Sequence, residues 1–96
     1  MAKVMRVVEG EGAAERVVGW MVFCPACQTG HLFDSRWTFD GNEEAPTFRA
    51  SMLAYPEGRQ GKARCHSFVT AGRIEFLADS THALAGRTVD LPDFNG

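Results

Sequence analysis

The sequence predicts a small β-rich domain, α+β at most, made of hairpins with one short helical turn. Short runs rich in Val, Phe and Trp alternate with Gly, Pro and Asn clusters, which is the pattern of strands and tight turns. Helical periodicity is nearly absent. The 96 residues, 45% hydrophobic and 23% charged, fit one globular domain over residues 1–96. Its core would be modest, so a bound metal would add useful stability.

The N-terminal half is expected to hold five strands. Gly10 and Gly12 end the first strand, and the second is the run of Val, Trp and Phe that leads to a cysteine-containing turn. The third leaves that turn, the fourth alternates before an Asp-Gly-Asn turn, and the fifth follows an extended Ala-Pro-Thr-Phe segment. The expected strands are Val4–Val8, Arg16–Phe23, His31–Phe33, Arg36–Phe39 and Arg49–Ala54.

The C-terminal half begins after a Gly- and Pro-containing loop and repeats the strand–turn–strand pattern. Ala71-Gly72 is the clearest two-residue hairpin loop in the chain, which would pair Thr70 with Arg73. Ser80 can cap a single helical turn. The expected elements are the strands Arg64–Thr70 and Arg73–Ala78, a helical turn Ser80–Leu84 ended by Gly86, and a last strand Thr88–Leu91.

The charge balance disfavours a nucleic-acid binder. Ten Lys and Arg against 12 Asp and Glu give a formal net charge of −2, and the densest basic stretch, Arg59–Arg64, holds only three cations and reads as a solvated loop. No apolar run approaches the ~20 residues needed to cross a bilayer. Arg6 and Glu9 interrupt any signal-peptide pattern. We therefore expect a soluble, cytoplasmic protein with no membrane partner.

The cysteines point to a metal site. Cys24 and Cys27 form a Cys-x-x-Cys turn, and Cys65 is the third cysteine of the chain. An odd number of cysteines in a reducing compartment favours metal binding over disulfides. A redox pair normally opens a helix, and Gly30–Phe33 does not begin one. Thiolates with imidazoles suit tetrahedral zinc, so we expect a zinc-ribbon-like site with these cysteines as ligands. The alternative for Cys65 is a small buried apolar residue.

The fourth zinc ligand is expected to be a histidine. The hairpin register returns the chain beside Cys65 just before His82, which makes His82 the favoured ligand. His66 would point to the opposite face of its strand and could bind the same ion only through a bulge. His31, close to the cysteine turn, is the third option. Asp79 would either orient a ligating imidazole through its second nitrogen or lie solvated in the turn.

Several segments together suggest a family. In the first half they are Phe23–Cys27 with His31, Trp37–Asn42 and Ala45–Phe48; in the second they are Cys65–Val69, Gly72–Ile74, Asp79–Gly86 and Thr88–Pro92. They resemble a group of small uncharacterised proteins of tailed bacteriophages and prophages. The resemblance implies zinc binding and a phage or mobile-element origin, and it implies no established activity. A more distant similarity, to another uncharacterised group, matches His66 instead of His82.

Members of the phage group are sometimes labelled ammonia monooxygenase. The sequence gives no support to that label, because it contains neither a membrane span nor a plausible oxygenase copper site.

Three functional hypotheses follow, and the first is favoured. A closed, structural zinc site would support a protein-interaction module for a host or phage protein, in the host cytoplasm if the chain is phage-encoded. A zinc-dependent hydrolase would keep an open metal position and use His66 or Asp79 as general base. A deaminase version lacks its His-x-Glu segment. A zinc-ribbon nucleic-acid binder is the third hypothesis. A redox role for the Cys24 and Cys27 pair is the least favoured. The sequence leaves the partner and the oligomeric state open.

Overall fold

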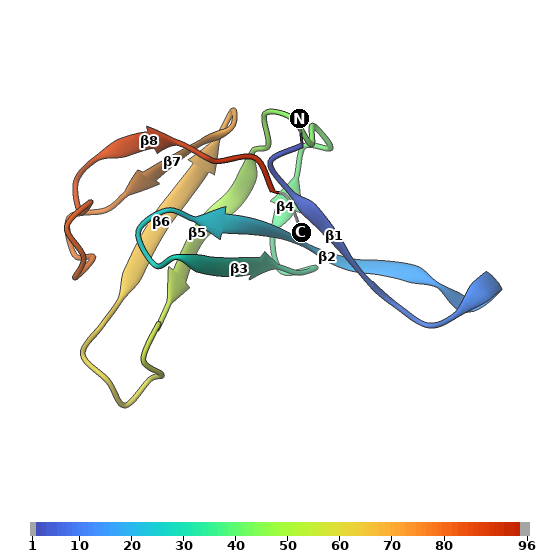
Figure 1. Cartoon of the computed structure of the whole chain (residues 1–96), viewed down its shortest axis with the longest axis horizontal. Helices are drawn as coiled ribbons and strands as arrows, with labels where there is room; N and C mark the ends of the chain where they lie inside the picture. Colours follow the sequence, from blue (N-terminus) through green and yellow to red (C-terminus); the bar gives the residue numbers. More distant parts are fainter. Residues whose placement is uncertain (1, 95–96) are drawn as a thin grey trace.

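The computed structural model describes residues 2–94, and within them it shows a small β-rich protein of two antiparallel sheets (Figure 1). The fold class predicted from the sequence is confirmed, and each expected strand is present with shifted ends. The strands are β1 Met5–Glu9, β2 Arg16–Cys24, β3 Thr29–Phe33, β4 Thr38–Phe39, β5 Phe48–Ala54, β6 Cys65–Thr70, β7 Arg73–Phe76 and β8 Thr88–Asp90.

The predicted helical turn is wrong in position. The structure places a short 3-10 turn, η1, at Gly12–Ala14, whereas the segment from Ser80 to Leu84 forms non-helical turns. The hydroxyl of Ser80 does not cap a helix, because it accepts a hydrogen bond from the His66 amide and donates one to the His66 carbonyl. A side chain engaged with a neighbouring strand cannot also cap the turn that follows it.

The two sheets divide the chain by sequence. Sheet A has the order β1-β2-β3, and sheet B has the order β4-β5-β6-β7-β8. The β6–β7 hairpin has the predicted register, with Thr70 opposite Arg73. Ala71 and Gly72 have φ values of 50° and 80°, the two positive values that a type I′ turn requires. This register fixes how the chain returns toward the start of β6.

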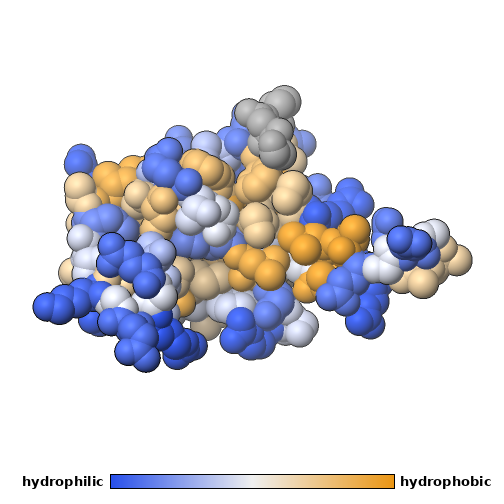
Figure 2. Space-filling view, turned by 60° about the horizontal axis from the view of Figure 1, so that its bottom comes forward, coloured by the Kyte–Doolittle hydropathy of each residue, from blue (hydrophilic) through white to orange (hydrophobic). Residues whose placement is uncertain are grey.

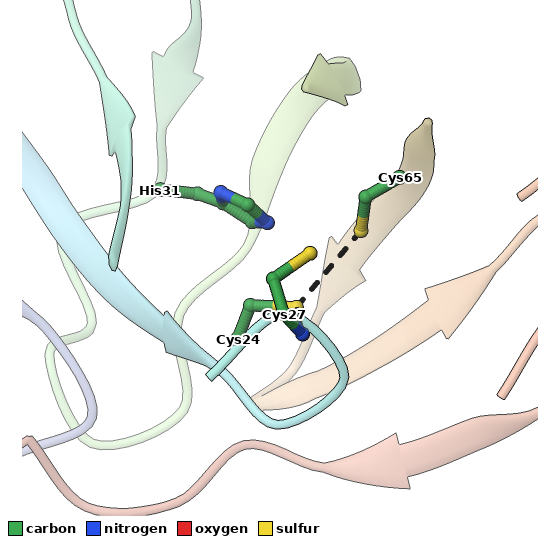
Figure 3. A group of neighbouring side chains, drawn as sticks. All are labelled: Cys24, Cys27, His31 and Cys65. Atoms are coloured by element: carbon green, nitrogen blue, oxygen red, sulfur yellow. Dashed lines mark hydrogen bonds between the residues drawn. The ribbon is translucent and has the colours of Figure 1, made fainter. Parts of the chain in front are cut away.

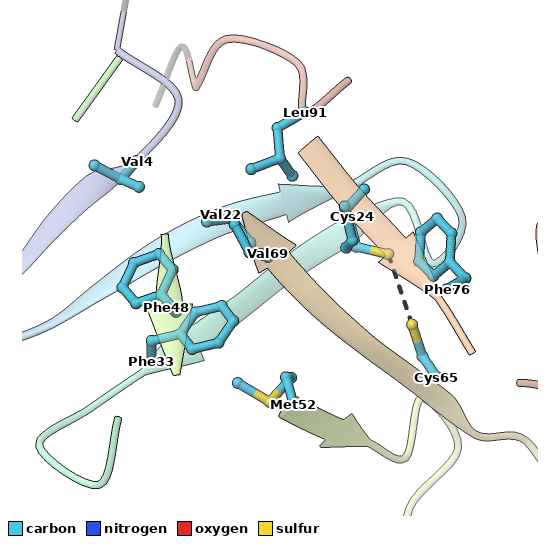
Figure 4. Close-up of a cluster of buried hydrophobic side chains, with 11 residues drawn as sticks. Val4, Val22, Cys24, Phe33, Phe48, Met52, Cys65, Val69, Phe76 and Leu91 are labelled. Carbon is cyan, nitrogen blue, oxygen red and sulfur yellow. Dashed lines mark hydrogen bonds between the residues drawn. The ribbon is translucent and has the colours of Figure 1, made fainter. Parts of the chain in front are cut away.

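A single core lies between the sheets (Figure 4). Phe33 of β3 stacks on Phe48 of β5 with ring centroids 4.1 Å apart, which joins sheet A to sheet B. Burial of such large apolar side chains is the main stabilising contribution in a domain of this size. The buried members are Val4, Val22, Cys24, Phe33, Phe48, Met52, Cys65, Val69, Ile74, Phe76 and Leu91.

The distal part of the β1–β2 hairpin projects from this body (Figure 1). Every residue from 8 to 17 is exposed, including Val8 and Val17, each 45% exposed. Figure 2 shows apolar side chains gathered where the hairpin joins the rest of the molecule. This segment therefore contributes little to the core.

In the part of the chain that the structure describes, no helix has the length and apolarity needed to cross a membrane.

A candidate metal centre and a candidate catalytic triad

The turn between β2 and β3 positions two thiols. Cys24 ends β2, and the amide of Cys27 donates a hydrogen bond to its sulfur at 3.3 Å. The turn closes with a 2.9 Å bond from the Gln28 amide to the Cys24 carbonyl, and Gln28 takes a φ of 58°. Hydrogen bonds that backbone amides donate to sulfur stabilise a thiolate, so the turn is suited to metal ligation.

His31 and Cys65 complete the group from two other strands (Figure 3). His31 lies opposite Val22 in the β2–β3 ladder and is 6% exposed, and Cys65 is the buried first residue of β6. One ligand atom from each of Cys24, Cys27, His31 and Cys65 lies within 4.8 Å of the others. None of the three cysteines forms a disulfide. These four side chains can therefore hold one metal ion.

The donor set and its spacing fit tetrahedral zinc. The sulfurs of Cys24 and Cys65 are 3.9 Å apart, against about 3.8 Å for two thiolates on one tetrahedral zinc with bonds of ~2.3 Å. The Nε2 atom of His31 is buried without a hydrogen-bond partner among the described residues. A buried imidazole nitrogen normally has a partner, and a metal ion would supply it.

The electrostatics of the thiols also favour a cation. A hydrogen bond from Cys65 lowers the pKa of Cys24 to about 3, and the same contact, with burial, raises the pKa of Cys65. Burial, followed by the charge on Cys24, raises the pKa of Cys27 to about 11. Three thiols this close cannot all ionise unless a positive charge offsets them. A divalent cation supplies that charge and deprotonates coordinating thiols.

The structure does not bring His82, the favoured fourth ligand, into this group. The chain does turn back beside β6, where the Thr81 amide bonds the Arg64 carbonyl at 2.9 Å. The imidazole of His82, however, packs edge-on against Phe76 with centroids 4.5 Å apart, and its Nδ1 accepts from the Leu84 amide. Its Nε2 is buried without a partner among the described residues but lies outside the ligand group. The histidine that lies with the three cysteines is His31, the third option.

His66 points away from the metal centre, as strand alternation predicts, and joins a different cluster. Its Nε2 lies 3.1 Å from the hydroxyl oxygen of Ser51, and its Nδ1 lies 3.1 Å and 3.2 Å from the two carboxylate oxygens of Asp79. A carboxylate can only accept, so Nδ1 carries the proton and Nε2 accepts from the Ser51 hydroxyl. Ser51, His66 and Asp79 thus have the connectivity of a serine-hydrolase triad.

A bulge in β5 presents Ser51. Phe48 pairs with Val69 and Met52 pairs with Ser67, so the four-residue step on β5 faces a two-residue step on β6. Bulges of this kind re-aim side chains and are common next to active sites. The indole Nε1 of Trp37 donates to the Ser51 carbonyl at 3.1 Å and so supports the displaced backbone.

Ser80 fixes the base and the acid relative to each other. It follows Asp79 directly and is 7% exposed. Its hydroxyl accepts a hydrogen bond from the His66 amide at 3.0 Å and donates one to the His66 carbonyl at 3.1 Å. The side chains of His66 and Asp79 are 25% and 46% exposed, so both are open to solvent. The sequence predicted that Asp79 could orient an imidazole, but not that this imidazole would contact a serine.

The role of Ser51 is what the sequence reasoning missed. The residues around it, Arg49-Ala50-Ser51-Met52-Leu53, carry no local signature such as Gly-x-Ser-x-Gly. A serine in the middle of an expected strand has no feature that separates it from an ordinary solvent-facing residue. Only the three-dimensional placement of His66 and Asp79 identifies it.

A cavity of about 390 Å³ is lined in part by Trp37. Its wall includes Trp20 and Trp37, and Asp34 and Arg16 also line it. Trp37 therefore borders this cavity and contacts the Ser51 backbone at the same time.

One family model matches this chain. A family model described as "Bacterial ubiquitination-like system serine protease (BubE)" matches residues 2–77. The match includes the four residues of the metal group and both Ser51 and His66, and it ends two residues before Asp79. No curated protein and no solved structure gives a significant match. Because the family model covers most of its length, the chain belongs to the BubE family.

Proposed function

We propose that this chain is a serine protease of a bacterial ubiquitination-like system, with Ser51 as nucleophile, His66 as general base and Asp79 as the group that orients His66. The observation that carries the proposal is the continuous contact from Ser51 through His66 to Asp79, with 3.1 Å at each end. The family description supports it independently, since it names a serine protease.

The geometry is suited to acyl transfer. His66 Nε2 takes the hydroxyl proton as Ser51 Oγ attacks the scissile carbonyl carbon, and Asp79 stabilises the imidazolium that forms. The tetrahedral intermediate collapses when Nε2 returns that proton to the leaving amine. Water then enters with the same base, hydrolyses the acyl ester and restores the Ser51 hydroxyl.

The metal in this proposal is structural zinc. Four protein ligands would fill a tetrahedral site, and a catalytic zinc needs an open position for water. The metal group also lies on the core side of β6, whereas His66 faces outward. A zinc-dependent hydrolase is therefore the weaker proposal. The competing proposal is the zinc-stabilised interaction module for a host or phage protein, in which Ser51 would be inert.

Covalent labelling distinguishes the two. A fluorophosphonate probe should modify the zinc-loaded protein at a single residue, Ser51, because only a serine with an adjacent base attacks phosphorus at neutral pH. Mass spectrometry of tryptic peptides locates the adduct. Ser35→Ala, at an exposed serine away from His66, should label like the parent protein. Absence of the adduct in folded, zinc-loaded protein would favour the interaction module.

Trp37→Phe should slow this labelling by about tenfold with little loss of stability. The change keeps an aromatic ring beside Phe33 but removes the N–H that holds the Ser51 carbonyl, so the bulge loses one hydrogen bond of about 1 kcal/mol and its alignment. Labelling rate and thermal melting are measured on the same sample. An unchanged rate would mean that the bulge holds Ser51 without the indole.

A further inference from the structure

The metal group links the two sheets. Cys24, Cys27 and His31 belong to sheet A and the turn that closes it, whereas Cys65 is the first residue of β6 in sheet B (Figure 3). The sulfur–sulfur approach of 3.9 Å between Cys24 and Cys65 spans 41 residues of sequence. A metal ion bound here would tie sheet A to one point on sheet B.

That point is the residue before the general base. Cys65 points into the core and His66 points outward, so the two share a peptide unit but face opposite sides of β6. Cys65 pairs with Ala54 and His66 pairs with Leu53 at the end of β5. On the N-terminal side of Cys65, residues 55–64 form turns and bends and contain no strand. The start of β6 is therefore held by β5 on one side, by the segment 77–81 on the other, which bonds the backbones of Arg64 and His66, and by the metal group on its core face.

The triad lies entirely on the sheet B side of this link. Ser51 lies in β5, His66 in β6, and Asp79 follows β7. The Ser51–His66 contact thus depends on how the start of β6 sits against β5. Catalytic geometry is sensitive at this scale, since a displacement of about 1 Å can reduce a rate by about 10²-fold.

We propose that Cys65 is a positioning residue for the triad: its bond to the metal holds the start of β6 so that His66 stays within hydrogen-bond reach of Ser51. This proposal rests on the proposed serine-protease function. It differs from a purely stabilising metal in one respect. The triad depends on the bond between the metal and Cys65 in sheet B. The ligands in sheet A contribute only by holding the metal in place.

Two matched variants separate these roles. Cys65→Ser keeps three ligands on sheet A and cuts the link to β6, whereas Leu91→Ala opens a cavity in the core and leaves every metal ligand and triad residue in place. Both are prepared with saturating zinc, and their zinc content and melting temperature are measured. We expect fluorophosphonate labelling of Ser51 to slow by about 10²-fold in Cys65→Ser and by no more than about twofold in Leu91→Ala. Equal losses in both variants would overturn the proposal.

A readout on His66 keeps the test independent of activity. In ¹⁵N-labelled protein, the Nδ1 proton shared with Asp79 should give one sharp downfield signal in the parent protein and in Leu91→Ala. In Cys65→Ser it should broaden or shift. An unchanged His66 signal in Cys65→Ser would overturn the positioning role. Failure of the parent protein to label would instead reject the protease function and leave the His66 measurement to decide the coupling.

If Cys65→Ser does not fold, chelation of the parent protein supplies the same comparison. Zinc release, labelling rate and far-UV circular dichroism are followed together during a chelator titration. Labelling that falls with zinc release while the sheet signal persists supports the proposal. Labelling that persists after zinc release, or falls only when the sheet signal is lost, overturns it.

Discussion

Ser51→Ala should reduce peptide-bond hydrolysis by about 10⁴-fold or more and leave the fold intact. The variant removes the hydroxyl oxygen that would attack the substrate, from a half-buried position outside the core. Within the described residues, the only hydrogen bond of this hydroxyl is the one to His66. Hydrolysis of a fluorogenic peptide, or of a ubiquitin-like fusion protein, gives the rate. Circular dichroism and zinc content give the control.

The other two triad residues should show the interdependence of a single catalytic unit. His66→Ala should cost about as much as Ser51→Ala, and the double variant no more than either, because removing one member already disables the unit. Asp79→Asn should cost about 10²-fold to 10⁴-fold, since an amide can favour the wrong tautomer of His66. Additive losses in the double variant would contradict a shared mechanism.

Removing zinc should lower the melting temperature by about 10 °C or more. Cys24 and Cys65 are fully buried thiols 41 residues apart, so metal binding closes a long loop and is coupled to folding. Differential scanning fluorimetry with and without a strong chelator measures the shift. A melting curve that chelator does not move, in protein shown to contain stoichiometric zinc beforehand, would mean that the core alone maintains the fold.

The histidines provide the matched comparison for this prediction. His31→Ala should release zinc, because His31 is the one histidine whose ring nitrogen lies with the three sulfurs. His82→Ala should keep zinc and lose its packing on Phe76 and the hydrogen bond from the Leu84 amide. The opposite result would restore the ligand set favoured by the sequence.

The strands were predictable because local chemistry defines their ends. The Ala71-Gly72 loop indicated the β6–β7 register from sequence, and strand alternation placed His66 on the face away from Cys65. The helical turn after Ser80 was wrong because its hydroxyl bonds a strand that sequence proximity does not reveal. A capping signal describes the hydrogen bonds that a side chain can make to its own segment. Here the Ser80 hydroxyl bonds the backbone of His66 in β6 instead.

Three members of the metal group, the cysteines, were the expected ligands, whereas His31 was only the third choice for the fourth position. The strand alternation that placed Phe33 in the core also places His31 there, two residues earlier, beside Cys24 of the neighbouring strand. That signal was present, but proximity along the hairpin favoured His82. The sequence hypotheses placed any catalytic chemistry at the metal. The structure puts the metal group and the His66 cluster on opposite faces of β6, because Cys65 faces the core and His66 faces outward.

The contact between Ser51 and His66 could not be predicted from the sequence. It depends on two extra residues in β5 between Phe48 and Met52, and a bulge of this kind leaves no sequence pattern of its own. The phage or prophage origin suggested by the resemblance stays a prediction.

The projecting β1–β2 hairpin has a consequence for local unfolding. Its residues 8–17 are all exposed, so opening this tip breaks ladder hydrogen bonds but uncovers almost no apolar core. Local opening with so little loss of burial has a low free energy, well below that of global unfolding. The amides at the hairpin tip should therefore exchange with solvent far faster than those of β6. The molecule thus combines a readily opened arm with the strand β6, whose alternate residues are buried in the core and whose opening would expose them.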